Sequence, residues 1–319
     1  MRFLEVSEQG GRYVTRLRET ETPVAGPGEV LIRVAASGVN RADLAQIAGR
    51  YPPPPGESTI LGMEASGTIE ATGERVCVLL AGGGDAEYVA APVGQVFPAP
   101  PGLDLASAAG IPEAFLTAFV TLVLEAGLGA GRTALVHAGA SGVGLAAIQL
   151  AKFLGARVVA TTRSKEKLAA LERAGADIAV HSASEDLVAA IESRWGAGAV
   201  DVVLDPIGAA TLAGDLALLS VGGTIVLIST MSGAVVELDI AALMRRRGRI
   251  VGSMLRSRSR TEKAAIVARF REAILPGFSS GQLSVPVDAV VPLERAADAF
   301  QRMRGDKNTG KIVLDWRRG

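Results

Sequence analysis

Residues 133–150 strongly constrain the fold, because an apolar strand, a turn of small residues and an amphipathic helix follow one another directly. The strand is expected over 134–138, the turn over Gly139–Gly144 and the helix over 143–154. Free N–H groups in such a turn and the positive end of the helix dipole point at one place, and small side chains let the backbone approach a pyrophosphate. The pattern predicts a phosphate-binding turn. Ser141 replaces the second glycine of the usual fingerprint, however, and similar turns occur without a ligand.

The residues after the second predicted strand, 157–161, bear on the choice of cofactor. A carboxylate about 20 residues beyond the glycine-rich turn usually binds a ribose 2′-hydroxyl. Here the strand is followed by Thr162-Arg-Ser-Lys-Glu-Lys167, so that hydroxyls and cations stand at the strand end. This cluster suits a 2′-phosphate and predicts NADPH as the cofactor. The alternative is a solvated helix start capped by Ser164, and both can hold together because a capping serine can still face a phosphate.

From about residue 116 the chain alternates apolar strands with helices, which is typical of a parallel, doubly wound α/β sheet with right-handed crossovers. The strands are expected near 134–138, 157–161, 178–180, 201–204, 224–229 and 249–253, and the helices near 143–154, 164–174, 185–195 and 209–219.

The first part of the chain has a different rhythm, with short strands and many turns. An alternating strand is expected over 30–35, whereas Pro52–Pro55 can form neither a helix nor a central strand. Gly82–Asp85 is expected to be a second, flexible turn. The tail, with helices over 261–275 and 293–303 and a last strand over 310–316, is interpreted as returning to the first domain.

The composition excludes several classes of function. The chain of 319 residues is long enough for two domains, and its 33 basic and 33 acidic residues give a formal net charge of zero. This balance argues against a general nucleic-acid or membrane-surface binder. Residues 1–8 lack the apolar core of a signal sequence, and no apolar run is long enough for a membrane span. A single cysteine, Cys77, fits a reducing cytoplasm and is expected to be buried and inert.

The chain resembles the zinc-independent branch of the medium-chain dehydrogenase/reductase superfamily, in particular the NADPH quinone oxidoreductases of the zeta-crystallin-like group. The resemblance covers nearly the whole sequence and depends on segments 37–43, 49–55, 61–67, 138–144, 205–208 and 308–314. It implies a GroES-like, mainly β substrate domain over 1–115, a Rossmann NADPH-binding domain over 116–255, a return to the substrate domain over 256–319, and an active site in the cleft between the domains.

The resemblance also bears on metal chemistry. Zinc relatives carry a cysteine where this chain has Asn40 and a histidine where it has Met63, and they insert a four-cysteine lobe that is absent from this sequence. A carbonyl reduced to an alcohol needs its growing alkoxide stabilised, usually by the metal. A quinone or activated enone needs less help because conjugation delocalises the incoming electron pair. The resemblance therefore favours zinc-independent reduction of such an acceptor by hydride from the nicotinamide.

The site residues that the resemblance implies fall into groups. Asn40 and Tyr51 flank the nicotinamide and the acceptor, as the catalytic candidates, and the Tyr51 hydroxyl would bind a quinone oxygen or donate a proton. Thr117 would face the nicotinamide amide. The remaining cofactor contacts would be Ser141, Gly142, Val143 and Gly144 at the pyrophosphate; Thr162, Arg163, Ser164 and Lys167 at the 2′-phosphate; Ser182 near the adenine, where relatives commonly have an aromatic; and Ser229, Thr230, Met231, Ser253, Met254, Leu255, Asn308 and Lys311 elsewhere along the cofactor.

Each of these roles has a purely structural alternative. Tyr51 could anchor the proline-rich loop, Thr117 could be an ordinary helical residue, and Lys311 could be a solvated strand end. Asp43 is expected to cap a helix. The other polar candidates are interpreted structurally: His137 as a core residue, His181 as a loop residue, and 245–249, which is rich in arginine, as a solvated turn.

The sequence thus predicts an NADPH-dependent quinone oxidoreductase that acts on a small quinone or enone, without nucleic acid or membrane, and forms a homodimer through the edges of the Rossmann sheets. Two alternatives remain open at this point. One is an enone or enoyl-thioester reductase on the same scaffold, and the other is an NADPH-binding regulatory protein with little redox activity.

Overall fold

The computed structural model describes residues 1–317, and the chain divides into two compact units. Of the described residues, unit 1 comprises 1–116 and 255–317, and unit 2 comprises Thr117–Met254. Among the described residues, none of the helices combines the length and the apolar character needed to cross a membrane.

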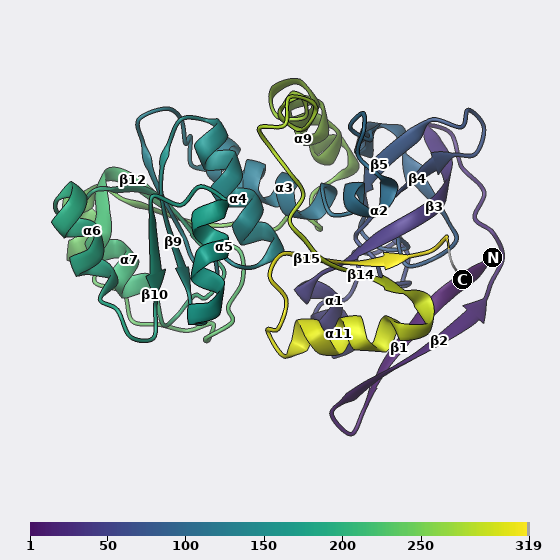
Figure 1. Ribbon diagram of the computed structural model, residues 1–319, viewed down its shortest axis with the longest axis horizontal. Helices are drawn as coiled ribbons and strands as arrows, with labels where there is room; N and C mark the ends of the chain where they lie inside the picture. Colours follow the sequence, from purple (N-terminus) through teal and green to yellow (C-terminus); the bar gives the residue numbers. More distant parts are fainter. Residues whose placement is uncertain (318–319) are drawn as a thin grey trace. The chain divides into compact units, whose positions relative to one another are not determined.

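Unit 2 is built on a six-stranded parallel sheet with the strand order β10-β9-β8-β11-β12-β13 (Figure 1). Helices cover both of its faces, with α4 and α5 on one side and α6 and α7 on the other (Figure 1). The elements are β8 (Thr133–Val136), α4 (Gly142–Phe153), β9 (Arg157–Thr162), α5 (Leu168–Arg173), β10 (Ile178–His181), α6 (Leu187–Trp195), β11 (Val200–Asp205), α7 (Leu212–Leu218), β12 (Leu219–Leu227), α8 (Ile240–Arg246) and β13 (Arg249–Gly252), preceded by the π-helix η2 (Phe119–Glu125).

This sheet forms because its strands are apolar on both faces. Leu135, Val159 and Val203, on neighbouring strands, are fully buried, as expected where helices cover both sides of a parallel sheet. The observed order places the first strand beside the second and the fourth, which is the arrangement of a Rossmann sheet. The predicted fold class is confirmed.

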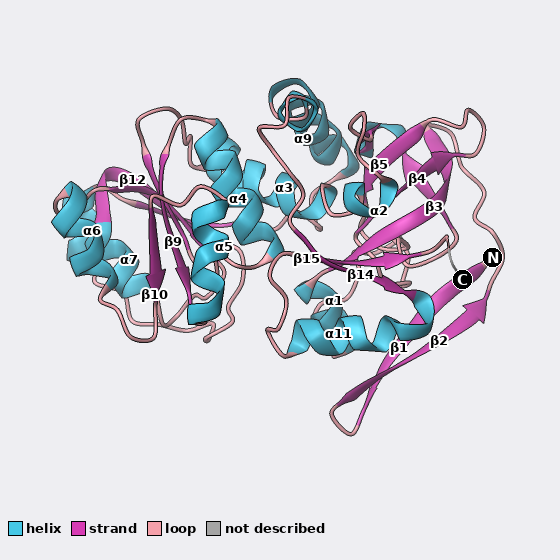
Figure 2. Cartoon of the chain, viewed as in Figure 1, coloured by secondary structure: helices cyan, strands magenta, loops and turns pink. Residues whose placement is uncertain are grey.

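Unit 1 is mainly β, as Figure 2 shows. Its seven-stranded sheet has the order β14-β15-β3-β4-β5-β7, with β6 also paired to β3, and β1 and β2 form a separate ribbon. The elements are β1 (Arg2–Gln9), β2 (Arg12–Glu19), β3 (Glu29–Val39), α1 (Arg41–Ile47), β4 (Glu64–Ile69), β5 (Arg75–Leu79), β6 (Tyr88–Pro92), η1 (Val93–Gln95), β7 (Val96–Pro98), α2 (Leu105–Ala108), α9 (Arg260–Ala273), α10 (Pro276–Ser279), β14 (Val287–Pro292), η4 (Leu293–Arg295), α11 (Ala296–Arg304) and β15 (Lys311–Asp315), and α3 (Pro112–Ala118) crosses the boundary between the units. The C-terminal strand β15 pairs antiparallel with β3, so that Ile312 lies opposite Val39.

Three local expectations were wrong. Gly82–Asp85 is not a flexible turn, because these residues are buried and the N–H groups of Gly83 and Asp85 donate to the carbonyls of Ile60 and Leu61. His181 is not a loop residue but the buried last residue of β10. The solvated turn expected over 245–249 is limited to Arg247 and Gly248, because the run begins at the end of α8 and finishes at the start of β13.

Candidate functional site

The phosphate turn of unit 2 begins helix α4, and Ser141 occupies its N-cap. The Ser141 hydroxyl oxygen accepts from the N–H of Gly144 at 3.0 Å, which satisfies one of the open donors of the helix. Gly144 has to be glycine, because a Cβ there would lie 2.5 Å from the carbonyl oxygen of Ala138. The serine in the fingerprint therefore contributes a cap, and the turn still packs closely on the end of the strand.

The cationic cluster follows β9 directly. Thr162 is the last residue of that strand and is largely buried, whereas Arg163 is exposed and Ser164 and Lys167 are half-buried. Ser164 stands at the N-cap of the short helix η3 (Lys165–Lys167), but its hydroxyl makes no capping bond, so only its position matches the capping prediction. The exposed part of the cluster thus combines two cations with a hydroxyl, which is the chemistry that a phosphate recruits.

The other predicted contacts of unit 2 lie just beyond strands β10, β12 and β13. Ser182 is exposed after β10, and the exposed residues 229–231 follow β12. Ser253 follows β13, is 7% exposed, and donates from its hydroxyl to Glu125 at 3.0 Å, while the next residue, Met254, is exposed. Because parallel strands point their carboxyl ends at one edge of a sheet, the structure brings these predicted residues and the phosphate turn to the same edge.

Thr117 lies in α3, where it is half-buried and its carbonyl accepts from the hydroxyl of Thr121 at 2.8 Å.

Both histidines make hydrogen-bond contacts inside unit 2. His137 contacts Thr161 through Nδ1 at 3.0 Å and Asp215 through Nε2 at 2.7 Å. His137 is therefore a satisfied core residue, as the sequence predicts.

In unit 1, Asn40 begins helix α1 and is part of a dense polar network. Its backbone N–H donates to Asp43 Oδ2 at 2.7 Å, which confirms the capping role expected for Asp43. Its side-chain amide donates to the carbonyl of Gly38 at 3.1 Å and to Glu64 Oε1 at 3.0 Å. Since both amide N–H bonds are used inside the unit, Asn40 has no donor left for an acceptor molecule.

Lys311 is held in the same network. It is 2% exposed, and its ammonium donates to Asn40 Oδ1 at 2.6 Å, to the carbonyl of Val39 at 3.3 Å, and to Glu64 Oε1 in a buried ion pair. The alternative of a solvated strand end is wrong, because β15 is paired on both sides and is buried along its length. Asn308, which the sequence predicts near the cofactor, is 7% exposed and donates to the carbonyl of Gly310 at 2.7 Å.

Glu64 connects Asn40 and Lys311 to the start of α3, and the sequence patterns did not identify it as a site residue. It is fully buried, and its second carboxylate oxygen accepts from the backbone N–H of Glu113, at the start of α3, at 2.8 Å. Gly38 leaves room for it, because a Cβ at that position would lie 2.2 Å from Glu64 Oε1. The available signal was an acidic residue within an apolar run, Leu61-Gly-Met-Glu-Ala65, since a carboxylate in such surroundings is rarely buried without a partner.

Several other carboxyl groups are buried in unit 1, so the region carries an excess of acids. Burial, and then the charge of Asp85, raises the pKa of Asp43 well above its usual range. Burial raises the pKa of Asp85 to about 6, although the Ser37 hydroxyl donates to it at 2.6 Å. Burial and then the charge of Glu64 raise the pKa of Glu113 to about 7. Clusters of perturbed acids of this kind are enriched at functional sites.

Tyr51 precedes the proline-rich loop and is half-buried. Burial, followed by the charge of Glu113, raises the pKa of its phenol above the ordinary value, and the charge of Arg256 opposes this. The phenol is therefore a protonated hydrogen-bond donor at neutral pH. The Arg256 guanidinium, which the sequence analysis did not single out, lies 5.1 Å from the ring centroid.

The positions of the zinc ligands do not suit a metal. The Asn40 amide is already bonded to Lys311 and Glu64, and an ammonium ion stands among these groups. Met63 is 1% exposed and offers only a thioether. Within residues 1–317, the structure contains no cluster of three or more His, Cys, Asp or Glu side chains that could hold a metal ion. This donor set does not fit zinc.

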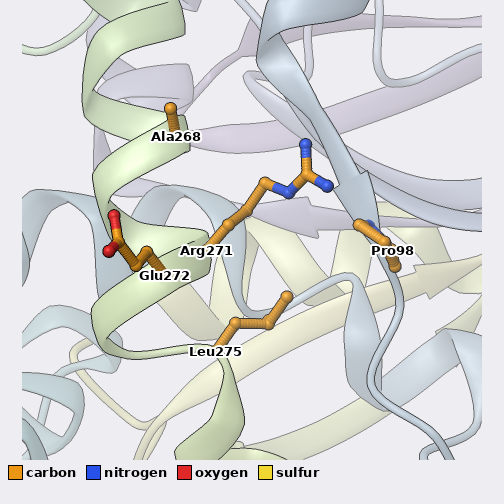
Figure 3. Close-up of a pocket in the computed structure, with 5 residues that line it drawn as sticks. All are labelled: Pro98, Ala268, Arg271, Glu272 and Leu275. Atoms are coloured by element: carbon orange, nitrogen blue, oxygen red, sulfur yellow. The ribbon is translucent and has the colours of Figure 1, made fainter.

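A surface pocket lies in unit 1 between the end of β7 and helix α9 (Figure 3). The Arg271 side chain reaches from the helix toward Pro98, and Glu272 points the other way (Figure 3). Ala268 and Leu275 complete the lining. None of the predicted site residues borders this pocket, so it has no part in the site described above.

Residues 26–101 match the family described as "Alcohol dehydrogenase GroES-like domain", and residues 142–270 match the family described as "Zinc-binding dehydrogenase". The quinone oxidoreductase of Lama guanicoe is 31% identical to the chain, over 98% of this chain and 97% of the relative. The synaptic vesicle membrane protein VAT-1 homolog of Rattus norvegicus is 30% identical, over 98% of this chain and 84% of that protein.

Among solved structures, the quinone oxidoreductase from Thermus thermophilus, also solved in complex with NADPH, is 33% identical with a TM-score of 0.85, and the match covers 99% of this chain and 100% of that one. The similarity runs the full length of the chain, and both the Rossmann strand order and the unsuitable metal positions agree with it. The chain belongs to the zinc-independent quinone oxidoreductase group of the medium-chain dehydrogenase/reductase superfamily.

Proposed function

We propose that this chain is an NADPH-dependent, zinc-independent quinone reductase. The observation that carries the proposal is the end of β9, where Thr162, Arg163 and Lys167 stand in place of the acid that would select a 2′-hydroxyl. The quinone oxidoreductases of Lama guanicoe and Thermus thermophilus, at 31% and 33% identity, support the choice of acceptor.

In this proposal unit 2 binds the cofactor. The pyrophosphate lies at the start of α4, where the N–H groups of Gly142 and Val143 and the helix dipole favour negative charge. The 2′-phosphate lies against Arg163, Ser164 and Lys167. The segments that follow β12 and β13, residues 229–231 and 253–254, border the nicotinamide half, and Leu255, the first residue of unit 1 after them, continues the second segment. When bound, NADPH supplies the hydride.

Unit 1 supplies the acceptor side. Reduction of a quinone to a hydroquinone takes up one hydride and one proton, and the protonated Tyr51 phenol is suited to donate a hydrogen bond to a quinone oxygen as negative charge grows there. Asn40 has its amide donors committed to Gly38 and Glu64 and its amide oxygen to Lys311, so we assign it the positioning of the Glu64–Lys311 pair rather than proton donation.

The test is a rate panel that uses NADPH with 1,2- and 1,4-naphthoquinone, an activated enone and an enoyl thioester. Preferential turnover of the quinones is expected. Faster turnover of the enone or thioester would replace the assignment with that of an enone or enoyl-thioester reductase. Tight NADPH binding without turnover of any acceptor would favour a regulatory protein.

We also propose a homodimer formed through β13, which ends the parallel sheet of unit 2 and pairs only with β12 among the strands of residues 1–317. The segment before it exposes apolar side chains, including Val235 at 91%, Ile240 at 64% and Met244 at 71%. Such exposure supports an interface with a second copy. Light scattering should give twice the chain mass, and Ile240→Glu with Met244→Glu should give a monomer; a monomeric wild-type protein would contradict the assignment.

A further inference from the structure

Arg256 makes an unusual set of contacts for a residue outside any helix or strand. It lies between β13 and α9 and is 3% exposed. Its Nε donates to the carbonyl of Ala81 at 2.7 Å, its Nη1 to the carbonyl of Tyr51 at 3.0 Å, and its Nη2 to Gln46 Oε1 at 2.6 Å. One guanidinium thus joins helix α1, the start of the proline-rich loop and the segment after β5.

The same group also contacts the Tyr51 ring, with the guanidinium carbon 5.1 Å from the centroid. Tyr51 is therefore held twice by one side chain, through its backbone carbonyl and through the face of its ring. Prolines 52–55 already restrict the backbone that follows. Stacking on a planar, rigid guanidinium further limits the orientations open to the ring, and a lysine cannot reproduce this arrangement.

We propose that Arg256 is the positioning residue of Tyr51: it holds the loop and the ring together so that the phenol meets the acceptor in one orientation. This inference rests on the proposed function, in which Tyr51 contacts the quinone. Arg256 itself donates its bonds inside unit 1 and acts through the tyrosine. A small displacement of a catalytic group can cost up to about 100-fold in rate, so such a residue is expected to affect turnover strongly.

The charged groups around Arg256 and Tyr51 determine how the phenol should respond. The carboxyl group of Glu113 disfavours the phenolate, and Arg256 favours it. Asp43 and Glu57 also act on Arg256, and Lys263 on α9 lies within reach of both Arg256 and Glu113. Removing the guanidinium charge should therefore raise the pKa of Tyr51 further.

The chain has only three tyrosines, so the ring can be observed directly. Uniform labelling with 3-fluorotyrosine should give three ¹⁹F resonances, and Tyr51→Phe assigns one of them. Arg256→Gln should shift the Tyr51 resonance toward that of the free amino acid and move its titration midpoint to higher pH. Arg33→Gln is the matched control, because that arginine lies 5.6 Å from the ring of Tyr88 and should leave the Tyr51 resonance unchanged.

The kinetic arm is a double-mutant cycle with 1,4-naphthoquinone. Arg256→Lys should lower kcat at least about tenfold with unchanged NADPH affinity, and should have less than about a twofold effect in the Tyr51→Phe background. Equal losses in both backgrounds, or an unmoved Tyr51 resonance in a folded Arg256→Gln protein, would overturn the proposal. If the wild-type protein reduces no quinone, the proposed function fails, and the ¹⁹F measurement still decides whether Arg256 positions the ring.

Discussion

Loss of the Lys311 ammonium should strongly destabilise unit 1. Lys311→Met keeps most of the aliphatic stem and removes the charge. The Lys311 and Glu64 side chains are 3% and 0% exposed, so the substitution leaves a carboxylate buried without its cation. Breaking a buried pair on one side costs about 3–5 kcal/mol. The amide of Asn40 and the N–H of Glu113 still donate to Glu64, so we expect a loss of about 3 kcal/mol in the free energy of unfolding.

The assay is urea denaturation followed by tryptophan fluorescence. The chain has two tryptophans, and Trp316 lies in the core of unit 1, where its indole donates to Ser37 Oγ at 3.0 Å. A Trp195→Phe background therefore makes the signal specific for unit 1. Arg18→Met is the control, because Arg18 and Glu5 form an exposed pair with 51% and 46% of their side chains accessible, and such pairs contribute only about 0.2–1 kcal/mol.

The double variant Lys311→Met/Glu64→Gln separates the ion pair from simple packing. Glutamine keeps an oxygen that can accept from Asn40 while removing the unpaired charge. If the pair is coupled as the structure indicates, the double variant should lose at least about 1.5 kcal/mol less than the sum of the two single losses. Additive losses, or a Lys311→Met protein as stable as the wild type, would refute the reasoning.

Three further outcomes are expected. Arg163→Ala with Lys167→Ala should weaken NADPH binding at least about tenfold, or about 1.4 kcal/mol, and leave NADH almost unaffected in a fluorescence titration; equal losses would argue against a 2′-phosphate site. Quinone reduction should survive exhaustive treatment with a metal chelator. If elemental analysis found one zinc per chain, and chelation removed the zinc and the activity together, the zinc-independent assignment would be wrong. Burial lowers the pKa of His137, but the charge and hydrogen bond of Asp215 more than offset this and raise it overall. A histidine whose pKa is higher in the folded protein stabilises the fold at pH values below its unfolded pKa of about 6.5. This stabilisation is lost as the pH rises through the folded pKa, so unit 2 should unfold more easily at pH 9 than at pH 6. His137→Gln should flatten that dependence.

The sequence predicted unit 2 well because its signals are local. Each strand is a short apolar run, each helix follows within a few residues, and the crossover rule sets the right-handed connection of each strand to the next. The positions of Ser141, Thr162 and Ser229 at one edge follow from this topology alone, since all three lie at or beyond the carboxyl ends of parallel strands. Boundaries shifted, as with β12, which begins at Leu219 rather than near residue 224, and helix α8 (Ile240–Arg246) was not among the predicted helices.

The polar network of unit 1 could not be predicted in the same way, because its contacts are distant in sequence. Lys311 and Glu64 are 247 positions apart, and a lysine at the start of a terminal strand is usually solvated. Lys311 is buried because β15 pairs with a strand on each side, and no local pattern in residues 308–315 predicts that pairing. The resemblance identified Lys311 as a residue of interest, but it did not reveal that its ammonium is engaged with Glu64 and Asn40.

The role of Arg256 beside Tyr51 could not be predicted from the sequence either, because its contacts are also distant along the chain. The segment Leu255-Arg-Ser-Arg-Ser-Arg260 alternates arginine with serine, and nothing in it distinguishes its arginines from one another. Its first arginine is nevertheless buried against a tyrosine 205 positions away, whereas Arg260 is 55% exposed and pairs with Glu29. The difference lies in the partners, because carbonyl oxygens and an aromatic face stabilise a buried guanidinium only where the fold assembles them. The sequence could therefore identify the tyrosine as a candidate, but only the fold could show which residue orients it.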